Sequence, residues 1–170
     1  MSASKTGYVN GSDVLLYVNS KAVGHSSTHT ATFSSETKDR AVKPVASKGI
    51  GSGKWKRKGV VGLAIAVQTE GLRFYNETEF GFKDLLAAWK QGESVKLKLC
   101  ERESSDSPYL QGDFVISSLE ENAPAQDDAT YKASFDNDGE PDVLDPAVIT
   151  QTDPDLTTQG GGGTGTQNVG

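Results

Sequence analysis

The stretch Gly81–Gly92, GFKDLLAAWKQG, decides how the rest of the chain is interpreted, because it is the one segment with a clear helical pattern. Four large apolar side chains recur there at the spacing of a single helix face, and they are Phe82, Leu85, Leu86 and Trp89. Asp84 lies in the first turn, where a carboxylate can meet free amide hydrogens, and Gly92 supplies a left-handed stop. A helix of about three turns is marginal in water. We therefore predict that the four apolar side chains pack the helix onto neighbouring strands.

The remainder of the chain is typical of short strands separated by turns. The predicted strands are 14–18, 22–24, 28–34, 60–68, 94–101, 109–119 and 130–136. In the fourth of them, Val61, Leu63, Ile65 and Val67 form an apolar face, and the opposite face carries small side chains. This pattern predicts a mainly β (α+β) fold, a β-sandwich or barrel of about seven strands with one flanking helix, a long loop and extended termini.

Composition divides the chain into three parts. Residues 1–12 are polar and predict an N-terminal arm, residues 13–138 hold the predicted β domain, and residues 139–170 predict an acidic, Gly-rich extension. The net charge of −6 belongs to the end of the chain, since seven carboxylates and no Lys or Arg follow Lys132. The rest of the chain is close to neutral, with 17 basic and 16 acidic groups.

Residues 38–58 predict a long basic loop, punctuated by glycines. Its cations, with one tryptophan among them, are Lys38, Arg40, Lys43, Lys48, Lys54, Trp55, Lys56, Arg57 and Lys58. A loop of this length is usually functional or mobile. A phosphate-binding loop is disfavoured, because Lys48 stands where its first glycine belongs and Trp55 replaces the hydroxyl residue after Lys54. Nucleic-acid contact remains an alternative. We favour a third interpretation, in which the basic segment meets an acidic surface on another copy, such as the residues after Lys132.

The sequence offers little to a catalyst or to a cofactor. His25 and His29 have no Cys, Asp or Glu at metal-ligand spacing beside them, so two half-exposed histidines are the default. Cys100, the only cysteine, is expected to be an ordinary strand residue on the outward side with Lys96 and Lys98. The N-terminus shows no signal-peptide pattern, and no apolar run reaches the roughly 20 residues that span a bilayer. We expect no enzyme activity, no cofactor, no metal and no membrane contact.

Three blocks in a fixed order carry a resemblance to a known family. They are the SSETKDR segment with the loop ending in GKWKRKGVVGLAIAVQTE, the helix–strand unit DLLAAWKQGESVKLK, and SLEENAPAQDDATYKASF. Over residues 11 to 139 the chain resembles the major tail protein, or tail tube protein, of long-tailed bacteriophages. Residues 140–170 fall outside the resemblance.

The resemblance implies a structural protein of the virion tail that assembles in the bacterial host cytoplasm. Such subunits form hexameric rings that stack into a tube around the tape measure protein, between tail terminator and distal tail proteins, and double-stranded DNA later passes through the bore without specific binding. The loop 38–58 would then reach toward a neighbouring ring or subunit. Because a bore that lets DNA slide should be acidic or neutral, the candidate lumen-facing side chains are Gln68, Glu70, Asp113 and Asp136, whereas Lys96, Lys98 and Lys132 are expected on other faces.

Two alternatives stay open at the level of sequence. The tube of a phage-derived tail-like particle would need the same subunit. A monomeric β-sandwich binding module, for example for glycans, would need exposed aromatics over a cleft, and the free aromatics are few: Trp55, Tyr75 and Tyr109.

Overall fold

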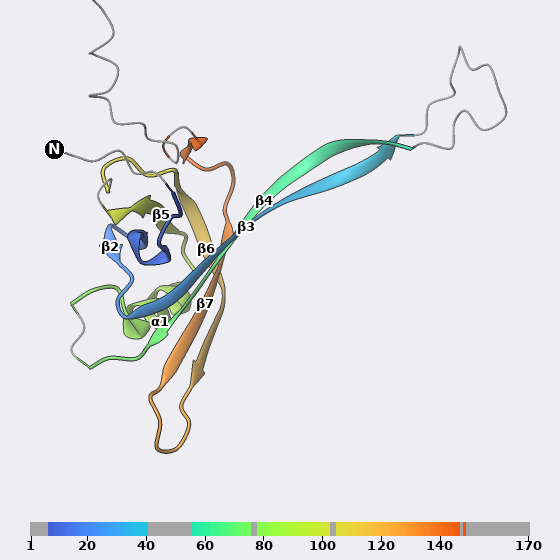
Figure 1. The fold of residues 1–170 in the computed structure, drawn as a ribbon. Coiled ribbons are helices and arrows are strands. Elements are labelled where there is room, and N and C mark those ends of the chain that lie inside the picture. The colour runs from blue at the N-terminus through green and yellow to red at the C-terminus, as the bar shows by residue number, and fades with distance from the viewer. Residues whose placement is uncertain (1–6, 41–55, 76–77, 103–104, 147, 149–170) are drawn as a thin grey trace, which may run out of the picture.

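The computed structural model describes residues 7–40, 56–75, 78–102, 105–146 and 148 (Figure 1). Its strands form one antiparallel sheet, and a single α-helix lies against it. The elements are the 3₁₀ turn η1 (Gly11–Asp13), β1 (Val14–Val18), β2 (Lys21–Ala22), β3 (Ser26–Arg40), β4 (Arg57–Leu72), α1 (Phe82–Gln91), β5 (Val95–Glu101), β6 (Leu110–Asn122), β7 (Thr130–Asn137) and β8 (Val143–Leu144). The predicted mainly β class with one flanking helix is confirmed.

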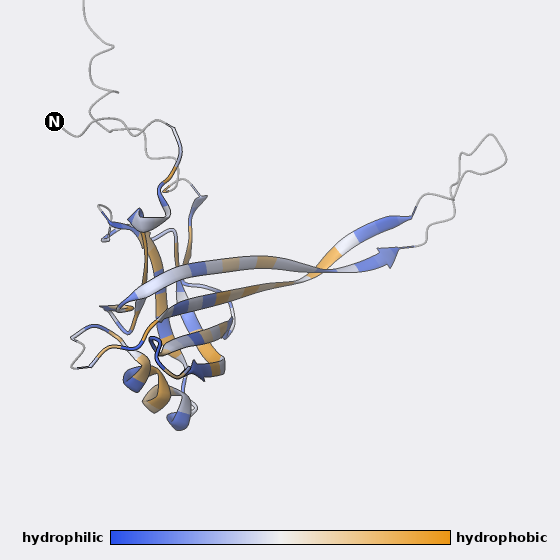
Figure 2. Cartoon of the chain, turned by 60° about the horizontal axis from the view of Figure 1, so that its bottom comes forward, coloured by the Kyte–Doolittle hydropathy of each residue, from blue (hydrophilic) through white to orange (hydrophobic). Residues whose placement is uncertain are grey.

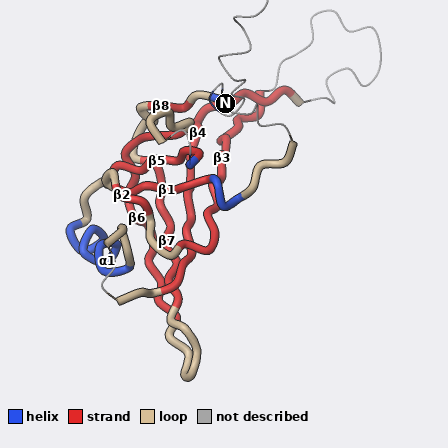
Figure 3. The backbone as a smooth tube through the Cα atoms, turned by 60° about the vertical axis from the view of Figure 1, so that its left-hand side comes forward, coloured by secondary structure: helices blue, strands red, loops and turns tan. Residues whose placement is uncertain are grey.

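The strands follow the order β2-β1-β5-β6-β7-β4-β3. β6 joins the two halves of the sheet, because its first residues pair with β5 and its later residues pair with β7. The sheet curls, so that Leu16 of β1 and Leu97 of β5 share one apolar cluster with Val67 of β4 and Phe135 of β7. The core therefore lies inside the curl of a single sheet, as the views in Figures 1 and 3 indicate.

A close approach of two strands holds the end of this core together. The Tyr131 hydroxyl of β7 is buried and donates a hydrogen bond to the backbone oxygen of Gly24, at 2.9 Å. Gly71 of β4 lies beside this ring, and a Cβ at that position would come within 2.8 Å of both Tyr131 and the backbone oxygen of His25. Glycine is needed here for space, which sequence alone did not indicate.

Helix α1 begins and ends as its sequence predicts. The Gly81 amide donates to the Asp84 carboxylate at 3.3 Å, and Gly92 takes a left-handed φ of 68° while its amide donates to the Ala88 and Trp89 carbonyls. These contacts satisfy backbone groups that a helix terminus otherwise leaves free.

The predicted packing of α1 is only half right. Leu85 is fully buried and Phe82 packs beside it on the core, but Leu86 and Trp89 remain 45% and 52% exposed. The third contact comes instead from Ala88. A short helix touches a sheet along a narrow line, and here that line follows residues three apart, so the two larger side chains on its flank are left uncovered.

The domain ends later than residue 138. Val143 and Leu144 form β8, which pairs with Leu110 and Gln111 of β6, and Asp142 forms an ion pair with Lys96 at 2.7 Å. Composition could not show this, because a two-residue strand leaves no periodic pattern. Residues 149–170 of the predicted extension lie outside the described part of the chain, as do residues 1–6 of the predicted N-terminal arm. Within the described ranges, no helix has the length and apolar character that crossing a membrane requires.

Candidate assembly surfaces

The long β3–β4 hairpin leaves the body of the protein. β3 and β4 pair from Ser26 opposite Gly71 to Arg40 opposite Arg57. β7 accompanies β4 only from Ala66 to Leu72. Beyond that point no other described strand pairs with β3 or β4. The two strands project from the body as a two-stranded ribbon (Figure 1). We call residues 33–40 and 57–64 the arm.

The arm exposes large apolar side chains. They are Phe33, Val60, Val61 and Leu63, with exposed fractions of 56%, 59%, 54% and 76%. A register shift between Glu36 and Thr37 leaves Val61 without an opposite residue, which marks a bulge in the ribbon. Figure 2 shows apolar segments continuing outward from the body. Because an isolated two-stranded ribbon is marginally stable in water, such side chains indicate a surface that another molecule covers.

The predicted loop 38–58 is strand at both ends. Lys38 and Arg40 close β3, and Arg57 and Lys58 open β4, so these four cations sit on a paired ribbon. The sequence missed this because residues 34–40 and 57–59 hold no apolar side chain, and therefore no apolar alternation to detect. Lys56 forms an exposed ion pair with Asp39 at 3.7 Å. The predicted contact residues Lys43, Lys48, Lys54 and Trp55 lie outside the described residues.

A polar face covers the outer side of β4 and β7. Gln68 lies opposite Ser134, Glu70 opposite Lys132, and Ala66 opposite Asp136. Three of the four candidate lumen residues, Gln68, Glu70 and Asp136, therefore share one face of the sheet. Thr28, Thr30 and Thr32 continue this face onto β3, opposite Glu70, Gln68 and Ala66. We call this surface the polar face.

Two details of the polar face differ from the expectation. Lys132, expected elsewhere, forms an ion pair with Glu70 at 2.9 Å, and this contact raises the pKa of Lys132. Asp113, the fourth candidate, lies at the far end of β6, where it pairs with Lys96 at 2.9 Å. The polar face is therefore less acidic than the sequence indicated. Strand alternation gives the side of a residue but not its cross-strand partner.

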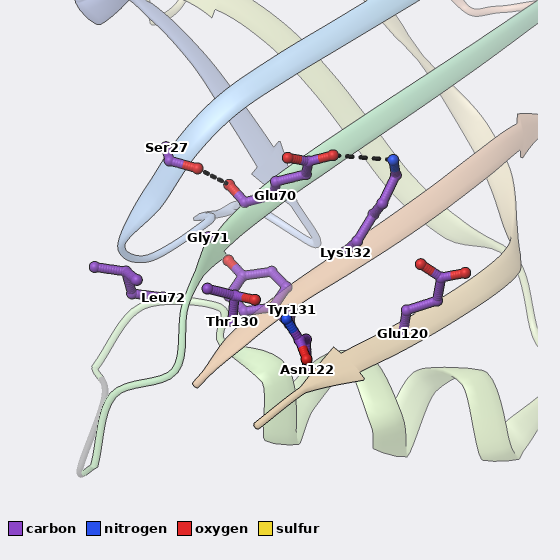
Figure 4. A pocket seen from close by; sticks show the side chains of 9 residues that line it. All are labelled: Ser27, Glu70, Gly71, Leu72, Glu120, Asn122, Thr130, Tyr131 and Lys132. Carbon is purple, nitrogen blue, oxygen red and sulfur yellow. Dashed lines mark hydrogen bonds and ion pairs between the residues drawn. The ribbon is translucent and has the colours of Figure 1, made fainter. Parts of the chain in front are cut away.

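An open hollow of about 270 Å³ lies at the edge of this face (Figure 4). The Glu70–Lys132 ion pair borders it, with Glu120 of β6 nearby, and the Ser27 hydroxyl donates to the Glu70 backbone oxygen at 3.1 Å. Three of its lining residues, Ser27, Glu70 and Lys132, are already paired among themselves. Among the described residues no group of three His, Cys, Asp or Glu side chains could hold a metal ion.

The histidines and the cysteine have structural roles. His29 Nδ1 lies 3.0 Å from the buried hydroxyl of Thr69 and 3.3 Å from the Ser26 hydroxyl, and burial lowers the pKa of His29. His25 is exposed and stacks on Phe74, with ring centroids 4.3 Å apart. Cys100, expected on the outward side, is fully buried, and burial raises the pKa of its thiol. A buried, protonated thiol is a poor nucleophile.

An antiparallel β subunit with an uncovered arm is typical of a structural protein that associates with copies of itself. The comparison with protein families is specific: the profile of the phage tail tube protein family matches residues 8–143. The chain belongs to this family, which confirms the resemblance drawn from residues 11–139. It is thus a structural subunit of a phage tail tube, with its place in the virion tail. A search of curated protein sequences gave no match.

Solved structures with the same fold come from phage-like particles. The chain matches a component of the virion of a native gene transfer agent particle with a TM-score of 0.62 and 18% identity, over 79% of this chain and 97% of that one. It also matches a component of the tail of an empty gene transfer agent particle, refined with C6 symmetry, with a TM-score of 0.61 and 20% identity, over 81% of this chain and 99% of that one. These likenesses agree with the mainly β class.

Proposed function

We propose that the chain forms homohexameric rings, that the rings stack into the tail tube, and that the arm supplies contacts between subunits. One observation carries the proposal: four large apolar side chains on the arm have no cover within the described chain, although the core beside them is fully packed. The C6 symmetry named for the similar tail supports six copies per ring. A closed ring also covers the free edges of β3 and β2, which a monomer leaves open.

The polar face is the surface that best suits a DNA conduit. Along β3, β4 and β7 it presents Thr28, Thr30, Gln68 and Ser134, with Lys132 neutralised by Glu70. Hydroxyl and amide groups hold DNA phosphates weakly, and a lysine that is already paired adds little attraction. We assign Gln68, Glu70 and Asp136 to the bore and remove Asp113, which is bound to Lys96. A positively charged substitution there, such as Gln68→Lys, should slow DNA ejection while leaving tubes intact.

The basic segment 38–58 is assigned to an inter-subunit contact with an acidic surface of another copy. Reversing Lys54, Lys56, Arg57 and Lys58 to Glu should impair self-assembly, and normal tubes from this variant would contradict the assignment. The tape measure protein inside the tube, and the tail terminator and distal tail proteins at its ends, are the expected partners. Assembly takes place in the bacterial host cytoplasm, and the subunit has no catalytic role.

The tube of a phage-derived particle is the second candidate, and the gene transfer agent structures favour keeping it. It needs the same subunit in the same role. A monomeric binding module would leave the arm uncovered, so it fits the exposed side chains less well.

The direct test is electron microscopy of the purified chain over a range of concentrations, with sizing in parallel. We expect rings or tubes with six-fold symmetry. A chain that stays monomeric at every concentration, including in the presence of tail initiator proteins, would contradict the proposal.

A further inference from the structure

The arm is basic toward its end as well as apolar along its length. Residues 35–40 and 56–60 hold five Lys or Arg against two carboxylates. These cations are Lys38, Arg40, Arg57 and Lys58 of the arm, and Lys56, which directly precedes it. A surface that covers the arm must therefore offer both negative charge and apolar contact.

The opposite end of the subunit has both properties. Residues 119–129, which are the end of β6 and its connection to β7, hold four carboxylates and no Lys or Arg. All four are exposed, and they are Glu120, Glu121, Asp127 and Asp128. Glu121 forms an ion pair with Arg73, so residues 72–75 and 119–129 together carry four carboxylates and one cation. Beside this connection lie Leu72, Phe74 and Tyr75, with exposed fractions of 43%, 60% and 89%. We call residues 72–75 and 119–129 the acceptor end.

Strand register fixes these two surfaces at opposite ends of the molecule. β4 runs 16 residues from Arg57 to Leu72, which at about 3.3 Å per residue spans about 50 Å. Arg57 pairs with the last residue of β3, whereas Leu72 pairs with Thr130, the residue directly after the acidic connection. The Arg73 amide also donates to the Ala129 carbonyl at 2.8 Å, which holds the apolar and acidic parts of the acceptor end together. Figures 1 and 3 show the β6–β7 turn pointing away from the arm.

We propose that the arm of one copy docks on the acceptor end of a copy in the next ring. This inference rests on the proposed stacking of rings and names the partner surface. When copies keep the same orientation, as they do in stacked rings, complementary patches at opposite ends of one subunit join them head to tail and generate an open stack. Charge complementarity fixes the direction of stacking, since arm against arm and acceptor against acceptor bring like charges together.

Charge also distinguishes the acceptor end from other occupants of the arm. Nucleic acid would attract the arm but would be repelled by the acceptor end, so reversing the charge of Asp127 and Asp128 would not weaken its binding. The acidic residues Asp153 and Asp155 could serve instead as the contact of the basic segment. Removing residues 149–170 distinguishes this alternative from the acceptor end, because the deletion removes Asp153 and Asp155 and leaves the β6–β7 connection intact.

The test uses two full-length variants that reverse one side of the contact each. Arg57→Glu/Lys58→Glu changes the arm, and Asp127→Lys/Asp128→Lys changes the acceptor end at exposed turn positions outside any strand. Matched controls with the same change in net charge are Lys21→Glu/Lys83→Glu and Glu79→Lys/Glu93→Lys, all at exposed positions away from both surfaces. Circular dichroism confirms folding, and electron microscopy with light scattering measures tube formation.

Each variant alone should raise the concentration needed for tube growth by about tenfold or more, because like charges then meet at every ring junction. Mixing the two variants should restore tubes, since the acidic arm of one then meets the basic turn of the other. Deleting residues 149–170 should leave tube growth unchanged.

Three outcomes would overturn the inference. Wild-type tubes together with normal tubes from the Asp127→Lys/Asp128→Lys variant would remove the acceptor end while leaving the proposed function standing. Folded variants that fail alone and also fail as a mixture would show that the two surfaces do not meet. A wild-type chain that forms neither rings nor tubes would overturn the proposed function, and this inference with it.

Discussion

The two halves of the β3–β4 hairpin teach the most about this molecule. In β4 the same alternation places Ile65 and Val67 in the core, 7% and 0% exposed, but leaves Val61 and Leu63 in solvent at 54% and 76%. The sequence does not change character between them. The neighbours change, because β7 flanks β4 only from Ala66 onward. Alternation therefore sets which side a residue faces, and tertiary contacts decide whether that side is buried.

The largest effect on the free energy of unfolding is expected in the core of the body, outside the arm. Phe114 is fully buried at the point where β6 passes from β5 to β7. Phe114→Ala should lower the free energy of unfolding by about 3–5 kcal/mol, because it removes buried surface and leaves a cavity. Denaturant titration of the non-assembled subunit measures this. A loss below about 1 kcal/mol would mean that β6 does not join the two halves of the core as described.

A smaller loss is expected from the hydrogen bond at the open end of the β3–β4 hairpin, where the hairpin joins the body. Tyr131→Phe keeps the packed ring and removes the hydroxyl that donates to the buried Gly24 carbonyl. The expected cost is about 1–3 kcal/mol, since a buried acceptor loses its partner. Tyr75→Phe, at an exposed position, is the matched control and should leave stability unchanged. Equal effects of the two substitutions would contradict the assigned hydrogen bond.

The buried position of His29, beside the Thr69 and Ser26 hydroxyls, makes the stability of the folded body sensitive to acid. Burial lowers the pKa of His29 below its ordinary value of 6.5, so near that value the unfolded chain binds more protons than the folded one. Stability from this source is complete above pH 6.5 and declines as the pH falls through the window down to the folded-state pKa. Unfolding measured as a function of pH should show a shallower decline for His29→Asn than for the wild type. Parallel curves would indicate that His29 does not contribute.

Most of the body's strands and its helix could be predicted from the sequence, but the contacts between segments far apart in the chain could not. Gly81, Asp84 and Gly92 fixed both ends of α1, since caps are local features. The packing of Leu86 and Trp89 was wrong because one helix face is wider than its contact with the sheet.

Polar positions show the same limit. Period-two alternation indicated polar faces of separate strands for Gln68, Glu70 and Asp136, and strand register shows that these residues share one face of the sheet. The pairing of Glu70 with Lys132 depends on which strands are neighbours, and neither sequence spacing nor charge could supply that. β8 was missed for a related reason, because its two residues acquire a role only beside β6.

Substitutions in the arm, unlike those in the body, should leave the stability of the subunit almost unchanged. Val61→Thr/Leu63→Thr places a β-branched side chain suited to a strand at both positions and removes exposed apolar surface that no described part of the subunit covers. We expect the free energy of unfolding of the subunit to change by less than about 0.5 kcal/mol, as for other exposed positions.

Tube formation by this same variant tests the central claim most directly. Folded Val61→Thr/Leu63→Thr protein, matched to wild type in circular dichroism, is examined by electron microscopy and light scattering under conditions in which the wild type grows tubes. We expect a stable subunit that no longer assembles, because the arm is completed only by another copy. Tubes that grow at the wild-type concentration and rate would contradict it.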